Sequence, residues 1–170
     1  HCECACGCRE AEAGKAQYQI QAHAPSHDSL AITPMMAASS IIAAVNGIAF
    51  GGGCEITEAV HLAVASERAV FAKPEINIGI PPTFGGTQRL PRLAGRKRAL
   101  ELLLTGDTFT PQRAYEIGLV NRVVEPGRAR AQALDLARRI AAKSPAAIRH
   151  GKRAFYRQLA PLAPAGAPLV

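Results

Sequence analysis

The sequence predicts an α/β domain, on three observations. Short apolar runs rich in β-branched residues, typical of buried strands, occur at 41–45 and 118–124. Segments rich in glycine or proline at 46–53 and 79–86 each lead into a stretch with helical spacing. The C-terminal half carries apolar residues at the spacing of amphipathic helices. A chain of 170 residues is long enough to bury one such core.

Composition and charge limit the classes of protein to consider. Hydrophobic residues make up 48% of the chain and charged residues 19%, which is typical of a globular domain without a membrane span. The net charge of +7 comes mainly from arginines between 89 and 98 and between 122 and 157. It favours a polyanionic partner, either nucleic acid or a phosphate-bearing small molecule. The start of the chain lacks the pattern of a secretory signal, so we expect a cytoplasmic protein.

Residues 1–40 show no sustained apolar period, and we expect an irregular or aberrant segment there. The spacing of its cysteines matches none of the common zinc-ligand pairs, so no metal site is predicted at Cys2, Cys4, Cys6 and Cys8. Cys54 stands apart from them, beside an acid. It is expected to be a small packed hydrophobic residue rather than a nucleophile.

From residue 41 the local signals agree with one another. The elements expected up to residue 95 are, in order, a buried strand at 41–45, a loop at 46–53, a short helix at 54–62, strands at 63–66 and 69–75 joined by a turn at Glu67 and Arg68, a loop at 79–86, and a helical stretch that opens at Thr87. The first loop holds four glycines, each able to adopt a positive φ.

The remainder of the chain is predicted to be mostly helical. Leu100, Leu103 and Leu104 share one face of a helix that ends at Gly106. Thr110 and Pro111 have the pattern of an N-cap and a first helical residue, and a short strand follows at 118–124. The last two helices meet at Ser144 and Pro145; the apolar stripe of the first consists of Leu134, Ala137, Ile140 and Ala141. Residues 161–170, rich in proline and alanine, are expected to form a loose tail.

Two acids stand beside the two glycine-rich loops. Glu55 lies on the first turn of the helix that follows three glycines, where unpaired backbone N–H groups can stabilise an oxyanion. Glu75 follows Pro74 at the start of the second loop. Two carboxylates that face one small volume can divide the roles of acid and base, because their repulsion separates their pKa values. Addition of water to a double bond needs that division of roles.

Four blocks of the sequence resemble the crotonase family, and specifically an enoyl-CoA hydratase. They are IIAAVNGIAFGGGCEI, FAKPEINIGIPPTFGGTQRL, LLLTGDTFTPQRAYEIGLVNRVV and AAKSPAAIRHGKRAF, in unbroken order from about residue 41 to 157. The resemblance implies a crotonase-like ββα spiral, related to the Clp protease fold, over residues 41–160. It also implies C-terminal helices, with those from Arg96 onward as candidates for contacts between subunits.

The resemblance implies the reaction and its groups. Family hydratases, which serve fatty acid β-oxidation among other pathways, add water in syn fashion to a 2-enoyl-CoA thioester to give a 3-hydroxyacyl-CoA. Gly52, between Gly51 and Gly53 in the substrate-binding loop, is expected to donate its N–H to the thioester oxygen in an oxyanion hole. Glu55 and Glu75 are expected to hold and activate the water and to protonate the α-carbon.

Further positions follow from the same resemblance. The backbone N–H of Thr83, after Pro82, is expected to help hold the water and substrate. Lys73 and Arg89 flank the site and are expected to be structural or solvated. Family isomerases usually keep only the later acid, so the presence of both favours a hydratase. Coenzyme A is part of the substrate, and no separate cofactor is expected.

Family members also carry, ahead of the first strand, a stretch with an AGxD motif that supplies a second oxyanion donor, and residues 1–40 contain nothing like it. We therefore expect a chain truncated at its N-terminus, with impaired activity. The resemblance also implies assembly as a trimer or as a hexamer formed by two trimers. Two alternatives stay open: an isomerase or acyl-CoA hydrolase of the same fold, or a non-catalytic subunit that assembles or binds RNA. Nucleic acid is disfavoured because aromatic residues are few.

Overall fold

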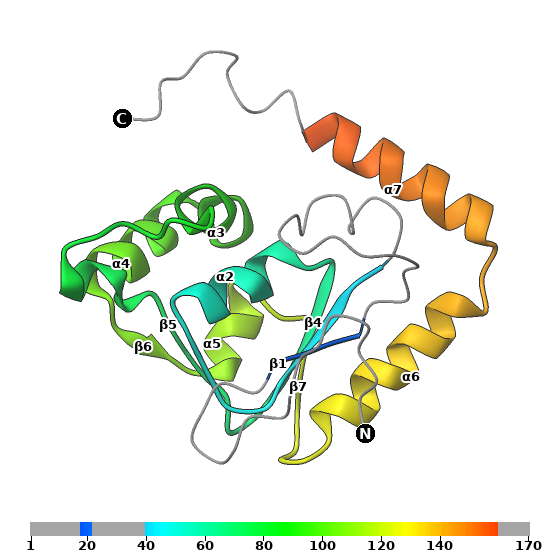
Figure 1. Ribbon diagram of the computed structural model, residues 1–170, viewed down its shortest axis with the longest axis horizontal. Helices are drawn as coiled ribbons and strands as arrows, with labels where there is room; N and C mark the ends of the chain where they lie inside the picture. Colours follow the sequence, from blue (N-terminus) through cyan, green and yellow to red (C-terminus); the bar gives the residue numbers. More distant parts are fainter. Residues whose placement is uncertain (1–17, 22–39, 160–170) are drawn as a thin grey trace.

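The computed structural model describes residues 18–21 and 40–159, and its strands form two sheets (Figure 1). The first sheet has the order β1-β2-β4-β7, and the second has the order β3-β5-β6. The bounds are Tyr18–Gln21 for β1, Ile42–Val45 for β2, Ile48–Phe50 for β3, Leu62–Ser66 for β4, Val70–Ala72 for β5, Thr108–Phe109 for β6 and Arg122–Val124 for β7.

The chain alternates between the two sheets and then adds a helix. β2 enters the first sheet, β3 the second, and α2 (Gly52–Ala59) follows. β4 and β5 repeat this path, each parallel to its predecessor, with Ile42 opposite Leu62 and Ile48 opposite Val70. After β5 come the 3₁₀ helix η1 (Pro74–Ile78) and the helices α3 (Gly86–Ala94) and α4 (Arg96–Thr105). This succession is the ββα repeat that the resemblance implied.

The C-terminal part closes the first sheet and then leaves it. α5 (Pro111–Glu116) leads into β7, which pairs in parallel with β4. α6 (Ala129–Ala141) packs on that sheet, whereas α7 (Pro145–Leu159) contains no buried residue. Figure 1 shows α7 at the outer edge of the molecule, beyond α6. One contact of α7 with the body is the edge of the Tyr156 ring against His61, with ring centroids 5.8 Å apart.

Strand β2 is buried on both faces, which explains its continuous apolar sequence. Because side chains alternate along a strand, Ala43 and Val45 belong to one core cluster, and Ile42 and Ala44 to the other. The first cluster lies under α2 to α5 and includes the stacked rings of Phe71 and Phe109, 5.5 Å apart. A fully buried large side chain such as Phe71 contributes about 1.5–3 kcal/mol.

Several local predictions are confirmed. β2 and β4 occupy the predicted strands, and a turn joins β4 to β5 at residues 67 and 68. α4 ends at Gly106, which has a φ of 70°. The Thr110 hydroxyl accepts a hydrogen bond of 3.1 Å from the N–H of Arg113, so Thr110 caps α5 with Pro111 inside the first turn. α7 spans the predicted last helix.

Other local predictions are wrong in part. The predicted loop 46–53 contains β3, because its partner β5 imposes extended structure that three residues alone do not signal. Of the four glycines there, only Gly51 has a positive φ, 54°. β1 lies in the segment expected to be irregular, where YQIQ is too short for a periodic signal. The rest of residues 1–40, with Cys2, Cys4, Cys6 and Cys8, and the tail 161–170 lie outside the described residues.

The buried faces of two helices differ in part from expectation, although Leu103 of α4 and Ala137 and Ile140 of α6 pack against the core as predicted. On α4, Ala99 and Leu102 are buried, whereas Leu100 and Leu104 are exposed. On α6, the buried residues are Ala129 and Ala133, with Leu136, Ala137 and Ile140 partly covered and Ala141 exposed. In both helices alanines are among the most buried residues. A count of large apolar residues therefore selects a face rotated from the true contact.

Candidate active site

The N-terminus of α2 is formed by the three consecutive glycines. Gly51 adopts a φ of 54° and donates its N–H to the carbonyl of Ala72, at 3.0 Å. The first helical hydrogen bond runs from the N–H of Glu55 to the carbonyl of Gly51, at 3.0 Å. The N–H groups of Gly52, Gly53 and Cys54 precede that bond, so they have no acceptor within the helix. The backbone of the expected oxyanion loop is therefore at a helix start, with the positive end of the helix dipole.

Glu55 is buried and oriented by a backbone donor. Its side chain is 2% exposed, and its Oε1 accepts a hydrogen bond of 2.7 Å from the N–H of Gly86, the first residue of α3. A Cβ at Gly86 would lie 2.8 Å from that oxygen and 2.5 Å from the Nζ of Lys73. A side chain at residue 86 would therefore displace the ends of the Glu55 and Lys73 side chains or move α3 away from the acid.

Glu75 approaches the same site from the opposite side. It lies in the first turn of η1, where Pro74 fixes the backbone before it. Its Oε1 would be 3.5 Å from a Cβ placed on Gly51, so the carboxylate lies beside the glycine loop. The Glu75 side chain is 11% exposed, and neither of its carboxylate oxygens has a hydrogen-bond partner among the described residues.

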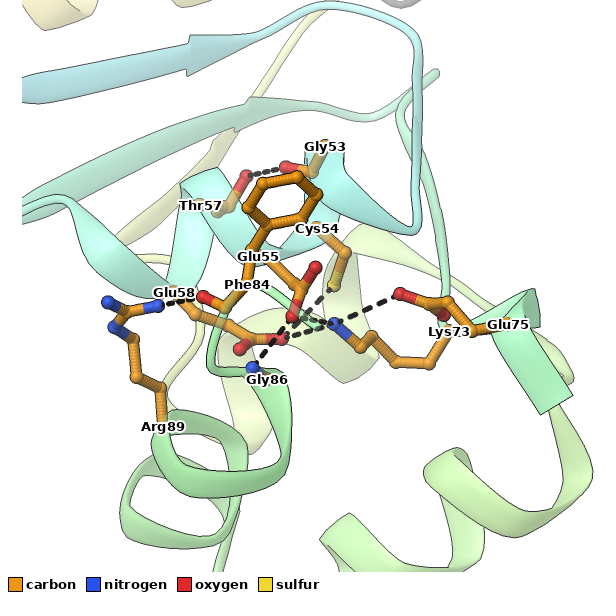
Figure 2. A network of polar contacts seen from close by, with 10 residues as sticks. All are labelled: Gly53, Cys54, Glu55, Thr57, Glu58, Lys73, Glu75, Phe84, Gly86 and Arg89. Atoms are coloured by element: carbon orange, nitrogen blue, oxygen red, sulfur yellow. Dashed lines mark hydrogen bonds and ion pairs between the residues drawn. The ribbon is translucent and has the colours of Figure 1, made fainter. Parts of the chain in front are cut away.

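Lys73 lies at the centre of the site, between α2 and η1 (Figure 2). Its side chain is fully buried, and its Nζ is 3.8 Å from Glu55 Oε1, 3.7 Å from Glu75 Oε1 and 3.3 Å from Glu58 Oε1. Two roles were expected for Lys73, structural or solvated, and the solvated one is excluded because the side chain is fully buried. The structure brings the two predicted acids together through this one ammonium group.

Glu58 is a third acid of the site. It lies one turn after Glu55 on α2, and its side chain is fully buried. Burial raises the pKa of the Glu58 carboxyl to about 7, although the nearby Lys73 ammonium acts in the lowering direction. Glu58 therefore binds a proton near neutral pH, which lowers the negative charge of the cluster.

Cys54 is fully buried beside Glu58, with its Sγ 3.7 Å from Glu58 Oε1. Burial and then the Glu58 charge raise the pKa of the thiol well above its usual value. A thiol that holds its proton is a poor nucleophile. The structure agrees with the prediction of a packed residue at this position.

The segment after η1 covers one side of the glycine loop. Pro82 is buried and Thr83 is exposed in this segment. The ring of Phe84, 71% exposed, would lie 3.9 Å from a Cβ on Gly52. Arg89 donates to the carbonyl of Phe84 and is turned away from Lys73 (Figure 2). The backbone donor that reaches an acid from this side is Gly86, and the roles of Pro82 and Thr83 stay predictions.

Sequence reasoning missed Glu58 and Gly86 and did not give Lys73 its central position. Glu58 follows Glu55 by three residues, which places both on one face of a helix, and this spacing could have identified it. Gly86 opens a helix directly after another glycine, a weaker signal. Nothing local distinguishes Lys73 from an exposed lysine that ends a strand, because its burial depends on α2 and η1 packing over it.

Residues 18–21 and 40–159 contain no candidate metal site and no candidate membrane helix. No group of three or more histidine, cysteine, aspartate or glutamate side chains in this part of the chain has an arrangement that could hold a metal ion. None of the helices described there is long and apolar enough to cross a membrane.

Comparison with known proteins identifies the family. The family model described as Enoyl-CoA hydratase/isomerase matches residues 9–167. This match begins well before residue 41, where the four resembling blocks start. The chain belongs to the enoyl-CoA hydratase/isomerase family, and its fold is the crotonase fold. An enoyl-CoA hydratase structure from Bacillus anthracis superimposes with a TM-score of 0.70 at 42% identity, covering 72% of this chain and 48% of that one.

Curated relatives agree with this assignment. The short-chain-enoyl-CoA hydratase of Clostridium acetobutylicum is 45% identical over 117 residues, which are 69% of this chain and 45% of the relative. The crotonyl-CoA hydratase of Syntrophomonas wolfei is 46% identical over 114 residues, 67% of this chain and 44% of the relative. The chain thus spans less than half the length of these two relatives.

Proposed function

We propose that the protein is an enoyl-CoA hydratase that adds water to a short 2-enoyl-CoA thioester such as crotonyl-CoA. One observation carries the proposal. The carboxylates of Glu55 and Glu75 lie 3.8 and 3.7 Å from the same buried ammonium, beside the glycine loop at the start of α2. Similarity to a short-chain-enoyl-CoA hydratase and a crotonyl-CoA hydratase supports the hydratase reaction and the short acyl chain.

The proposed reaction uses the two acids and the helix start together. A water molecule held between Glu55 and Glu75 attacks the β-carbon, and one carboxylate accepts the proton that the water loses. The other, which carries its proton as a carboxylic acid, delivers that proton to the α-carbon on the same face, so the addition is syn. The thioester oxygen, which gains negative charge as the β-carbon is attacked, accepts a hydrogen bond from the N–H of Gly52. The carboxylate oxygens of Glu75, which accept no hydrogen bond from the described residues, are available for the water.

Turnover of crotonyl-CoA tests the proposal. Hydration removes the absorbance of the conjugated thioester and adds the mass of one water to the product. Glu55→Gln and Glu75→Gln should each lower the rate by roughly 10²–10⁴-fold, the usual contribution of a general acid or base. Glu101→Gln, which replaces an exposed glutamate on α4, is the matched control and should leave the rate unchanged. Release of free thiol would identify a hydrolase, and a shifted double bond of unchanged mass would identify an isomerase.

Assembly, location and cofactor use belong to the same proposal. The protein forms a trimer or dimer of trimers in the cytoplasm, takes coenzyme A as part of its substrate, and needs no other cofactor or metal. The exposed Leu100 and Leu104 on α4 support subunit contacts. Sedimentation equilibrium should give a multiple of three chains, and Leu104→Glu should shift it toward the monomer. RNA retained without turnover would favour the non-catalytic alternative instead.

A further inference from the structure

Lys73 is a residue that the proposed reaction does not yet use. It follows β5 directly and is the N-cap residue of η1, so its backbone is fixed by two elements. Its side chain is fully buried, and its Nζ has no hydrogen-bond partner of good geometry among the described residues. A buried ammonium is costly unless opposite charges surround it. Here the surrounding charges include both proposed catalytic acids.

The distances from Lys73 Nζ set Glu58 apart from Glu55 and Glu75. Lys73 Nζ is closest to Glu58, at 3.3 Å, and lies at nearly equal distances of 3.8 and 3.7 Å from Glu55 and Glu75. Glu55 and Glu75 come from different elements, α2 and η1, and each directs its Oε1 toward the ammonium (Figure 2). Without a cation between them, two ionised carboxylates would repel one another in this buried volume.

The charges of the cluster do not balance without a further proton. Three carboxylates face one ammonium, so full ionisation would leave an excess of negative charge in a buried site. The other titratable groups of α2, α3 and α5 do not neutralise this excess. Cys54 on α2 is a buried thiol, and Arg89 on α3 donates to the carbonyl of Phe84 instead. Arg113 and Glu116 on α5 form an exposed ion pair with each other. A proton on Glu58 leaves Lys73 opposite the catalytic pair.

We propose that Lys73 is a positioning residue for this pair: its buried ammonium holds the carboxylates of Glu55 and Glu75 toward one another and offsets their negative charge. The inference rests on the proposed function, because it gives the two acids their roles. It assigns no contact with substrate to Lys73. The proposed role of Lys73 is electrostatic, so a neutral side chain of similar length should not replace that of Lys73.

The test compares Lys73→Gln, Glu58→Gln and the double variant Lys73→Gln/Glu58→Gln, with Lys97→Gln on the exposed face of α4 as the matched control. Titration of the Glu58 side chain by ¹³C NMR, assigned by the signal lost in Glu58→Gln, needs no turnover. In Lys73→Gln the midpoint of Glu58 should rise by about one pH unit or more, because an opposite charge has been removed. Lys97→Gln should leave it in place.

Kinetics then test the positioning of the pair. Lys73→Gln should lower kcat/KM for crotonyl-CoA at neutral pH by roughly 10–100-fold, the cost of a small misplacement of reacting groups, and should move the acidic limb of the pH profile to higher pH. The double variant should be about as slow as Lys73→Gln, because a Glu58 that is protonated in that background carries no charge for the second substitution to remove. A purely structural lysine would instead leave the pH profile in place.

The outcomes separate the two proposals. A Glu58 midpoint unchanged in Lys73→Gln, or an acidic limb of the pH profile that does not move in that variant, overturns the role of Lys73. If the unsubstituted protein does not hydrate crotonyl-CoA, the proposed function fails, and the titration still decides whether Lys73 sets the charge of the cluster. If Lys73→Gln does not fold, the double variant carries the comparison with Glu58→Gln.

Discussion

Replacing Gly86 by alanine tests how Glu55 is held. The added Cβ would lie 2.8 Å from Glu55 Oε1 and 2.5 Å from Lys73 Nζ, both closer than real Cβ contacts allow. α3 must therefore shift, or the two side chains must give way. The hydrogen bond of 2.7 Å from Gly86 N–H to Glu55 lengthens in either case.

The expected cost combines two effects. A buried hydrogen bond to a charged group contributes about 1.5–3 kcal/mol, and overpacking a closed site costs about 1–3 kcal/mol. Gly86→Ala should therefore lower the free energy of unfolding by about 2.5–6 kcal/mol. In the fraction that remains folded, misplacement of Glu55 should lower kcat on crotonyl-CoA by roughly 10²-fold.

The assay is urea unfolding followed by circular dichroism, with kcat measured in the absence of urea. Gly47→Ala is the matched control, because a Cβ there would meet nothing within 4 Å and its φ is not positive. Gly47→Ala should change the free energy of unfolding by less than about 1 kcal/mol. If Gly86→Ala is as stable and as active as Gly47→Ala, the reasoning about the approach of α3 to Glu55 is refuted.

Two further predictions concern stability. The folded-state pKa of Glu58 is about 7, above its ordinary value of 4.5, so the folded protein binds more protons between these values and stability falls as pH rises from about 4.5 to 7. By linkage, this group lowers the free energy of unfolding by about 3 kcal/mol over that range. Glu58→Gln should therefore flatten the pH dependence of the free energy of unfolding, measured by urea unfolding between pH 4.5 and 7. The same slope in Glu58→Gln and in the unsubstituted protein would contradict the buried position of Glu58. Thr110→Ala removes the cap of α5 and should cost about 1 kcal/mol, whereas Ser144→Ala, whose hydroxyl accepts a longer bond of 3.4 Å, should cost less in the same measurement.

The path of the chain was predictable where local chemistry decides it. The apolar run at β2, the turn at Glu67, the cap at Thr110 and the end of α4 at Gly106 each have a short-range cause in the sequence. β3 and β6 were missed, because strands of three and two residues owe their structure to β5.

The site was predictable in its acids and less so in what surrounds them. Glu55 and Glu75 were found because each is adjacent to a glycine-rich or proline-rich turn, and the structure brings both to one ammonium group. The position of Lys73 depends on packing between α2 and η1, which are separated by two strands. Gly86 could not be identified as the donor to Glu55, because a bond across 31 residues leaves no local pattern.

The measurement that tests the central claim most directly is the hydration rate of crotonyl-CoA by Glu55→Gln, Glu75→Gln and the double variant. If the two acids act as one unit on one water, each single substitution removes roughly 10²–10⁴-fold of the rate, and the double variant is only slightly slower than the slower single variant. Losses that multiply in the double variant, or a single variant with full activity, would contradict the account, since the two carboxylates would then not share a step.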